Sequence, residues 1–231
     1  MPLRVPLVTK RALNCSILHK KGVYMIFPPI MKGFVVLEGL DGAGTTTQKE
    51  LFSHRMRERG IPCHQTAEPT DMPAGRLIRA ILKGEVKVAG ATLARLFAAD
   101  RSEHIFDPVD GILHHLSLGE TVICDRYAFS SLAYQSLPCG FDFVLGLNKD
   151  FPLPSHLFFI DVPPSVCEER LKERLKREIF EHEHLQRRVL ANYRKTLELY
   201  ADSGVEITVI DGCEDRDLIS EKIFRIVTEG R

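Results

Sequence analysis

Four continuous runs of apolar or β-branched residues alternate with longer helical stretches along the chain. The runs are Phe34–Leu37, Thr121–Cys124, Leu157–Ile160 and Ile207–Ile210. Such runs are typical of strands buried on both faces of a sheet, and their alternation with helices indicates a parallel sheet with helical crossovers. With a weaker fifth strand at Ile61–Thr66, the chain is predicted to be an α/β protein: one doubly wound domain with a five-stranded parallel sheet and helices on both faces.

Helices are expected between and after these strands, where apolar residues recur at helical spacing. The expected ranges are 45–59, 73–83, 91–118 with a break near Pro108, 130–137, 164–177, 181–202 and 214–229. No internal repeat or long linker divides these elements. At 231 residues the length suits one large domain, and the only boundary that we expect lies near residue 32.

Residues 1–32 differ in charge from the rest of the chain. They carry six basic and no acidic side chains, whereas the whole chain is neutral, with 31 of each. We therefore expect a basic N-terminal extension at 1–32, followed by a domain at 33–231. Three explanations of the extension stay open: a disordered segment, a transit peptide, or a segment that is not translated because Met25 or Met31 is the true start.

The charge balance and the cysteines limit the partners. A neutral chain is not typical of proteins that wrap nucleic acid, and no apolar run approaches the roughly 20 residues that span a bilayer. The six cysteines are scattered and form no C-x-x-C pair, which favours reduced side chains over a disulfide framework or a zinc site. We therefore expect a cytoplasmic protein that binds neither nucleic acid nor a membrane.

A glycine-rich loop lies between the first strand and the first helix. Its sequence, EGLDGAGTTTQ, matches the pattern G-x-x-x-x-G-K-[ST] at Gly39, Gly44 and Thr46. Such a loop turns backbone N–H groups toward a phosphate, and the following helix directs its positive end to the same point. Thr45 stands where the pattern has a lysine that reaches the β- and γ-phosphates. On these residues alone, the loop is either a phosphate site or a structural glycine turn.

A second candidate site is Asp125-Arg126-Tyr127, at the carboxyl end of a predicted buried strand. Open α/β sheets bind their ligands at this edge. An arginine there can bind a phosphate through two hydrogen bonds, and a carboxylate can act through Mg²⁺ or orient the arginine. These three residues alone are more often a strand-end ion pair, but the run that follows, Ala128–Gln135, reverses that preference.

Five segments, in matching order and spacing, resemble the thymidylate kinases, the P-loop enzymes that phosphorylate dTMP. The segments are Phe34–Gln48, Thr66–Pro69, Leu96–Arg101, Asp125–Gln135 and Ile160–Pro164. The resemblance covers about 200 residues, from Gly33 to the C-terminus. It implies a P-loop kinase domain with a helical lid, ATP and Mg²⁺ as cofactors, dTMP as the substrate, and a homodimer.

The resemblance also assigns residues on the ATP side. Those implied to hold the ATP phosphates are Gly39, Leu40, Asp41, Gly42, Ala43, Gly44, Thr45 and Thr46. Thr46 and Asp125 are implied to bind Mg²⁺. Asp41 resembles the family's loop carboxylate that reaches toward the acceptor phosphate and the metal, so Asp41 and Arg126 are candidate catalytic residues.

On the dTMP side, the residues implied to bind the substrate are Glu68, Phe97, Arg101, Arg126, Ser131, Tyr134 and Gln135. Phe97 resembles the aromatic residue on which thymine stacks, Arg101 the arginine that hydrogen-bonds the base, and Arg126 the clamp on the phosphate. The other polar residues are implied to line the nucleoside pocket. Without the resemblance Phe97 would be interpreted as helix core, because Leu93, Leu96 and Phe97 share a helical face.

Basic residues gather where the family carries its mobile lid over ATP. They are Arg170, Arg174, Lys176, Arg177, Arg187 and Arg188. Phosphoryl transfer gains mainly from positioning and charge stabilisation, so a lid arginine can act as an arginine finger. We expect Arg174 and Arg177 to be catalytic, since Arg177 aligns best with the family's lid arginine. The alternative is a solvated amphipathic helix.

Two positive charges that are usual in the family are missing: the loop lysine, here Thr45, and the arginine before Glu68-Pro69, here Ala67. Removing one such donor typically costs about 10²–10³ in rate. The predicted function is phosphorylation of dTMP to dTDP with ATP and Mg²⁺, for dTTP and DNA precursor synthesis, with lid arginines taking over from the lysine. Two alternatives stay open: a catalytically weak or inactive nucleotide-binding homologue, and a deoxynucleoside salvage kinase.

Overall fold

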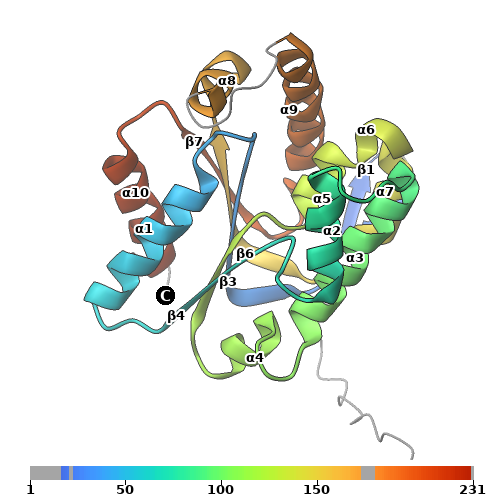
Figure 1. The fold of residues 1–231 in the computed structure, drawn as a ribbon. Coiled ribbons are helices and arrows are strands. Elements are labelled where there is room, and N and C mark those ends of the chain that lie inside the picture. Colours follow the sequence, from blue (N-terminus) through green and yellow to red (C-terminus); the bar gives the residue numbers. More distant parts are fainter. Residues whose placement is uncertain (1–16, 21–22, 173–179, 230–231) are drawn as a thin grey trace, which may run out of the picture.

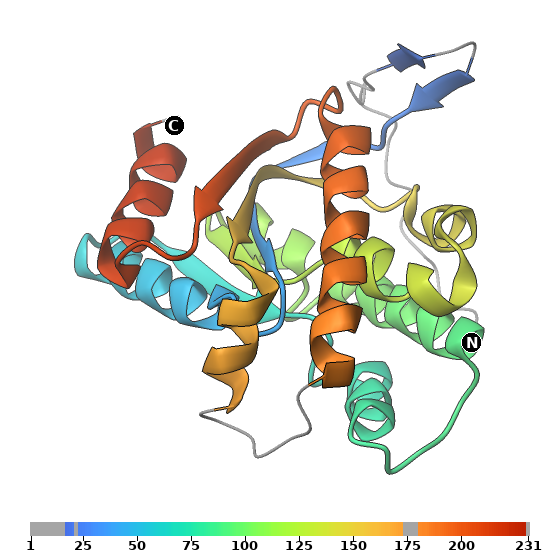
Figure 2. The same cartoon turned by 90° about the horizontal axis from the view of Figure 1, so that it is seen from above.

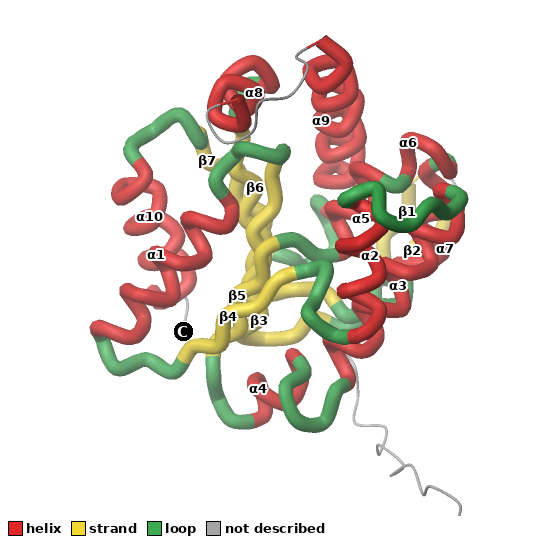
Figure 3. Tube along the Cα trace, in the orientation of Figure 1, coloured by secondary structure: helices red, strands yellow, loops and turns green. Residues whose placement is uncertain are grey.

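A computed structural model describes residues 17–20, 23–172 and 180–229. Five of its strands form one parallel sheet in the order β4-β5-β3-β6-β7 (Figures 1 and 3). Their bounds are β3 Ile30–Gly39, β4 Cys63–Ala67, β5 Thr121–Asp125, β6 Leu153–Asp161 and β7 Glu206–Asp211. The predicted α/β class and five-stranded parallel sheet are therefore confirmed. Two further strands, β1 (Ile17–Lys20) and β2 (Val23–Ile26), pair with each other as an antiparallel hairpin.

The helices of the described chain follow the predicted order, with several differences in extent. They are α1 Thr45–Glu58, α2 Pro73–Leu82, α3 Gly90–Phe106, α4 Ile112–Ser117, α5 Ala128–Tyr134, α6 Ser136–Cys139, α7 Phe141–Asn148, α8 Pro164–Lys172, α9 Phe180–Tyr200 and α10 Arg216–Glu229. The expected break near Pro108 separates α3 from α4. The segment expected as one helix at 130–137 is two short helices, and α7 was not expected. None of the described helices is long and apolar enough to cross a membrane.

The central strand β3 sends alternate side chains into two hydrophobic cores. Val35 and Leu37 pack toward α1 and α10, whereas Phe34 and Val36 pack on the opposite face with residues of α3, α5 and α9. Figure 2 shows these helices on the two sides of the sheet. All four side chains are fully buried. Because neighbouring side chains of a strand point to opposite faces, a strand covered on both sides needs the unbroken apolar run that the sequence shows.

The folded core begins before the boundary expected at residue 32. Strand β3 starts at Ile30, which is paired with Leu153 of β6, and Phe27 is buried with its ring 5.6 Å from that of Tyr200. Because Lys32 and Gly33 interrupt the apolar run, the sequence pattern indicated a strand that starts only at Phe34. Gly33 has φ 81°, and the pairing with β6 shifts register between Met31 and Val35, so the strand continues through an irregularity.

The carboxyl ends of the strands bring the candidate residues together. The loop after β3 leads into α1, the loop after β5 leads into α5, and the loop after β4 leads into α2. Since β5 lies between β4 and β3, these three loops meet at one edge of the sheet. This is the edge at which open α/β sheets bind ligands.

Candidate active site

Two cavities meet at this edge. We call the first the loop pocket; it has a volume of about 540 Å³ and is lined by residues 41–48 with Arg126, Ile160, Arg170, Leu171, Gly212, Glu214, Arg216 and Ile219. We call the second the side pocket; it has a volume of about 280 Å³ and is lined by Asp41, Ala67, Glu68, Pro69, Arg79, Leu82, Phe97, Arg101, Asp125, Arg126, Tyr127, Ser130, Ser131, Tyr134 and Gln135. Asp41 and Arg126 belong to both.

The loop between β3 and α1 has the backbone of a phosphate cradle. Gly42 and Gly44 have φ values of 90° and 99°, which L side chains rarely adopt. A Cβ on Gly42 would also lie 2.6 Å from the Cys167 carbonyl oxygen. Gly39 ends β3, and Leu40 buries its side chain in the core, so these two predicted residues support the loop from behind while Asp41 to Thr46 line the pocket.

Thr46 and Asp125 form a pair of oxygen ligands that suits Mg²⁺. The Thr46 hydroxyl donates a hydrogen bond to Oδ2 of Asp125. Oδ1 of Asp125 is buried and has no protein hydrogen-bond partner. Mg²⁺ prefers hard oxygen ligands and is commonly held by one or two protein groups together with substrate phosphates. The predicted metal residues therefore fit the ion.

The position of the missing lysine is occupied by a buried, uncharged side chain. Thr45 is 5% exposed, and among the described residues the cations that line the loop pocket are Arg126, Arg170 and Arg216. Arg170, on α8, donates to the carbonyl oxygens of Gly212 at 3.0 Å and Ala43 at 3.5 Å. The predicted lid residues Arg174 and Arg177 lie outside the described residues.

Arg126 stands at the junction of the two pockets. Its Nη2 lies 2.6 Å from Oδ1 of Asp41, and its Nη1 donates to the hydroxyls of Ser130 at 3.2 Å and Tyr193 at 3.3 Å. The guanidinium also lies over the ring of Tyr134, 5.2 Å from the centroid. The Tyr134 hydroxyl in turn accepts a hydrogen bond from the Asp41 N–H at 3.1 Å. The structure thus brings together the candidate catalytic residues Asp41 and Arg126.

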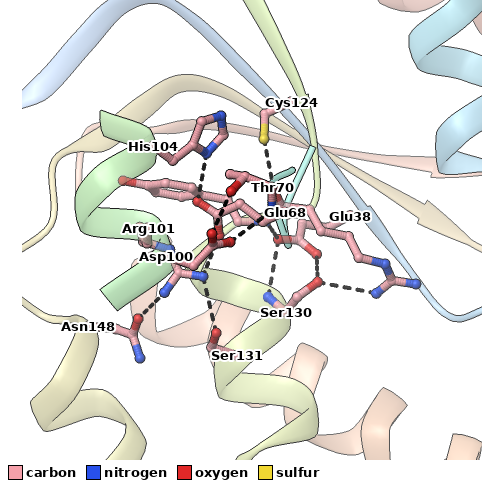
Figure 4. Close-up of polar contacts among 12 residues, drawn as sticks. Glu38, Glu68, Thr70, Asp100, Arg101, His104, Cys124, Ser130, Ser131 and Asn148 are labelled. Atoms are coloured by element: carbon pink, nitrogen blue, oxygen red, sulfur yellow. Dashed lines mark hydrogen bonds and ion pairs between the residues drawn. The ribbon is translucent and has the colours of Figure 1, made fainter. Parts of the chain in front are cut away.

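The deep end of the side pocket is a buried ionic network (Figure 4). Arg101, only 1% exposed, donates to Glu68 at 2.6 Å and to the Ser131 hydroxyl at 3.1 Å, and it also contacts Asn148. Nδ1 of His104 lies 3.1 Å from the second oxygen of Glu68. The Nε–H of Arg101 is buried without a protein partner. This network fixes the guanidinium plane at the end of the pocket.

The other residues predicted for the dTMP side line the same pocket. Phe97 of α3 is half-buried and faces the cavity, which the helix-core interpretation alone does not explain. Tyr134 and Gln135 come from the C-terminal end of α5. All the residues predicted to bind dTMP are therefore lining residues of one cavity.

Besides His104 and Asn148 of the buried network, sequence reasoning missed four polar residues of this region. Arg79 of α2 brings a guanidinium to the side pocket, where Ala67 lacks one, and donates to the Pro69 carbonyl oxygen at 2.5 Å. The others are Glu38, Ser130 and Tyr193, which lie behind Arg126. Glu38 and Ser130 stood inside the motifs, but Tyr193 lies far away in the sequence on α9 and carried no local signal.

Comparisons with known proteins agree with this geometry. The model of the thymidylate kinase family matches residues 37–223. The thymidylate kinase of Leptospira borgpetersenii is 33% identical over 201 residues, covering 84% of this chain and 92% of the relative. That of Leptospira interrogans is 34% identical over 198 residues, covering 84% and 92%. A probable thymidylate kinase of Thermococcus kodakarensis is 36% identical over 205 residues, covering 84% and 96%.

The matched residues include the glycine-rich loop and every residue that lines the side pocket. The fold, the pocket and the similarity over most of each chain lead to the same assignment. The chain belongs to the thymidylate kinase family.

Proposed function

We propose that the thymidylate kinase reaction of this family takes place where the two pockets meet, with transfer of the γ-phosphoryl group of ATP to the 5′-phosphate of dTMP. The observation that carries the proposal is that Asp41 and Arg126 line both pockets and form an ion pair at 2.6 Å. A donor phosphate in the loop pocket and an acceptor phosphate in the side pocket meet at this pair. The products are dTDP and ADP, and dTDP leads to dTTP and DNA precursors.

The side pocket is the proposed dTMP site. Arg126 binds the 5′-phosphate, because a guanidinium can form two parallel hydrogen bonds with phosphate oxygens. Phe97 stacks on the thymine ring, and Arg101 and Gln135 hydrogen-bond its edge. Ser131, Tyr134 and Glu68 complete the pocket, with Glu68 holding Arg101 in place. The dTMP phosphate oxygen is itself the nucleophile, so no covalent enzyme intermediate or strong general base is needed.

The loop pocket is the proposed ATP site. The N–H groups of Gly42, Gly44, Thr45 and Thr46 surround the phosphates, whereas those of Asp41 and Ala43 donate to Tyr134 and Leu40. Thr46 and Asp125 are the residues that would hold Mg²⁺. When bound, Mg²⁺ neutralises charge on the β- and γ-phosphates. Its removal with a chelator is expected to abolish turnover.

Other cations take over from the two missing positive charges in this proposal. Arg170 and Arg216 line the loop pocket beside Thr45, and Arg79 lines the side pocket beside Ala67. Arg174 and Arg177 stay the proposed lid residues that close on ATP. Replacing either lid arginine by alanine is expected to lower turnover, and unchanged turnover in both variants would contradict this part of the proposal.

Steady-state formation of dTDP from dTMP and ATP tests the proposal, with Thr45→Lys measured in parallel. The expected turnover of the unchanged chain is in the usual kinase range of about 1–100 s⁻¹. Negligible turnover that Thr45→Lys restores would instead identify a weak or inactive homologue. Phosphorylation of thymidine without that of dTMP would identify a deoxynucleoside salvage kinase.

We also propose a homodimer in the cytoplasm. Exposed apolar side chains gather on α2 and the loop that follows it, where Leu77 is 40% and Leu82 is 58% exposed. Such side chains favour burial against a second copy. Cys124, Cys139, Cys167 and Cys213 are free thiols, as expected in a reducing compartment. Light scattering of the purified chain tests the dimer, and a monomer at micromolar concentration would contradict it.

A further inference from the structure

Glu38 is a buried carboxylate to which the proposed reaction gives no role. It lies at the end of β3, just before the glycine-rich loop, and none of its surface is exposed. Oε1 accepts hydrogen bonds from the backbone N–H groups of Tyr127 at 2.8 Å and Ser130 at 3.1 Å. Oε2 accepts from the hydroxyl of Ser130 and, at 2.9 Å, from that of Tyr193. Figure 4 shows Ser130 facing Glu38.

Both hydroxyls that donate to Glu38 also accept from Arg126. Nη1 of Arg126 lies 3.2 Å from the Ser130 oxygen and 3.3 Å from the Tyr193 oxygen. A hydroxyl has one proton to donate. The two hydroxyl oxygens also lie 2.8 Å apart, where either can donate to the other. When both protons point to Glu38, both oxygens present lone pairs to the guanidinium. The ionised carboxylate therefore favours the arrangement in which both hydroxyls accept from Arg126.

Glu38 also holds the backbone on which Arg126 stands. Arg126 has φ 71°, a left-handed conformation that is strained for a non-glycine residue. Its own N–H donates to the Leu37 carbonyl at 2.9 Å, and the next N–H, of Tyr127, donates to Glu38. Such a conformation persists only when its surroundings over-determine it. The same carboxylate thus secures both the backbone and the side chain of Arg126.

We propose that Glu38 is a positioning residue for the acceptor phosphate, acting on Arg126 through the hydroxyls of Ser130 and Tyr193. The inference rests on the proposed function, in which Arg126 binds the 5′-phosphate of dTMP. Glu38 itself lines neither pocket. Its effect is to hold Nη2 of Arg126 against Asp41, at the point where the two pockets meet.

The surroundings of Glu38 make its charge sensitive to pH. Arg126 is the cation that faces it, and the other titratable groups near it are the Tyr193 hydroxyl and the Cys124 thiol. Burial raises the pKa of Glu38 to about 7, although Arg126 and the hydrogen bonds lower it. Protonation would leave Oε2 a poorer acceptor and would release the two hydroxyls from their fixed direction.

The test compares the affinities of thymidine and dTMP, which differ only in the phosphate. The unchanged chain is expected to bind dTMP at least about tenfold more tightly, the usual effect of charge-assisted hydrogen bonds. In Glu38→Gln the affinity for thymidine should stay the same, and the preference for dTMP should fall at least about fivefold. A loss of packing or folding would weaken both ligands equally, so the ratio separates positioning from a merely structural role.

A second variant keeps the test decisive if Glu38→Gln does not fold. Tyr193→Phe removes one of the two hydroxyls and should reduce the dTMP preference by a smaller factor. Tyr200→Phe is the matched control, because Tyr200 is a buried tyrosine of the same helix that packs on Phe27 and Phe129 away from Arg126. Its dTMP preference should equal that of the unchanged chain.

The pH profile supplies a further readout. Between pH 8 and pH 6 the dTMP preference of the unchanged chain should fall more than that of Glu38→Gln, because Glu38 becomes protonated in this range. Titration of the dTMP phosphate affects both proteins equally and so does not contribute to the difference. An unchanged preference in Glu38→Gln and Tyr193→Phe would overturn this inference alone. Equal binding of thymidine and dTMP by the unchanged chain would overturn the proposed role of Arg126 as well.

Discussion

Arg126 is the only non-glycine residue with a positive φ in the described chain, at 71°. Its conformation turns the guanidinium away from the end of β5 and toward Asp41. Backbone strain of this kind gathers at functional sites, where neighbouring hydrogen bonds sustain it. At Arg126 those hydrogen bonds come from Leu37 and Glu38, so the last residues of β3 determine where the guanidinium lies.

Arg126→Lys tests the geometry of this side chain apart from its charge. An ammonium cannot form the two parallel hydrogen bonds of a guanidinium. We expect the KM for dTMP to rise about tenfold to a hundredfold, with the thymidine affinity unchanged. Steady-state kinetics and calorimetric titration measure the two quantities. An unchanged KM would show that phosphate binding depends on charge alone.

Glu38 also predicts how stability depends on pH. Its pKa is raised from 4.5 to about 7 by burial, so folding favours the protonated form. Its contribution to the free energy of unfolding is therefore fully present below pH 4.5 and is lost as the pH rises through about 7. A change of this size corresponds to about 3 kcal/mol. Urea unfolding at pH 5 and pH 8 measures this dependence. At pH 8 Glu38→Gln should be more stable relative to the unchanged chain than it is at pH 5. The same pH dependence in both proteins would refute this prediction.

At the scale of the elements, α1 and α10 cover one face of the sheet, and the first turns of both helices line the loop pocket. Phe224 of α10 is 5% exposed, its ring lies 6.3 Å from that of Phe52, and the guanidinium of Arg59 lies 4.2 Å from its centroid. Arg55 adds an ion pair with Glu221 at 2.8 Å. The two helices thus pack as a unit on the face opposite the side pocket.

Phe224→Ala is expected to lower the free energy of unfolding by about 3–5 kcal/mol, because it removes a buried ring and leaves a cavity. The KM for dTMP should not change, since α10 does not line the side pocket. Leu218→Ala is the matched control on the same helix; Leu218 is 59% exposed, and its loss should cost no more than about 0.5 kcal/mol. Chemical denaturation measures both, and equal costs would contradict this packing.

At the scale of the whole molecule, the residues before Phe34 decide where the folded domain begins. Phe27 packs on Tyr200, and the Leu153 N–H donates to the Pro29 carbonyl at 2.9 Å. A chain that starts at Met25 keeps these contacts, whereas one that starts at Met31 loses them. The two possible starts therefore differ in stability as well as in length.

We expect the chain from Met31 to be less stable than the chain from Met25 by at least about 3 kcal/mol, the usual cost of losing a buried aromatic side chain. Thermal unfolding of both chains at one pH measures the difference. Phe27→Ala in the full chain should reproduce most of it, which separates the loss of this ring from the loss of strand pairing. Equal unfolding temperatures for the two chains would place the domain boundary at residue 32 after all.

Some features could be predicted from the sequence because they depend on local patterns. Strands buried on both faces must be continuously apolar, so the central strands were evident from runs such as Val35–Leu37. The glycine-rich loop was evident because positive φ values require glycine at Gly42 and Gly44. Helix α7 was not evident, because its short apolar segment at Phe141–Asn148 follows Pro138 and Gly140, residue types that commonly interrupt helices.

By itself the sequence determined the strands of the sheet and the phosphate loop, because each is encoded in neighbouring residues. The predicted residues of the side pocket came from the family resemblance that five local segments carry. Only the tertiary structure decided which groups support them. Glu38 and Tyr193 are 155 positions apart, yet they share a hydrogen bond behind Arg126. Arg79 likewise lines the side pocket only because α2 packs beside it. Contacts of this kind arise when separate elements pack side by side, and no local pattern records them.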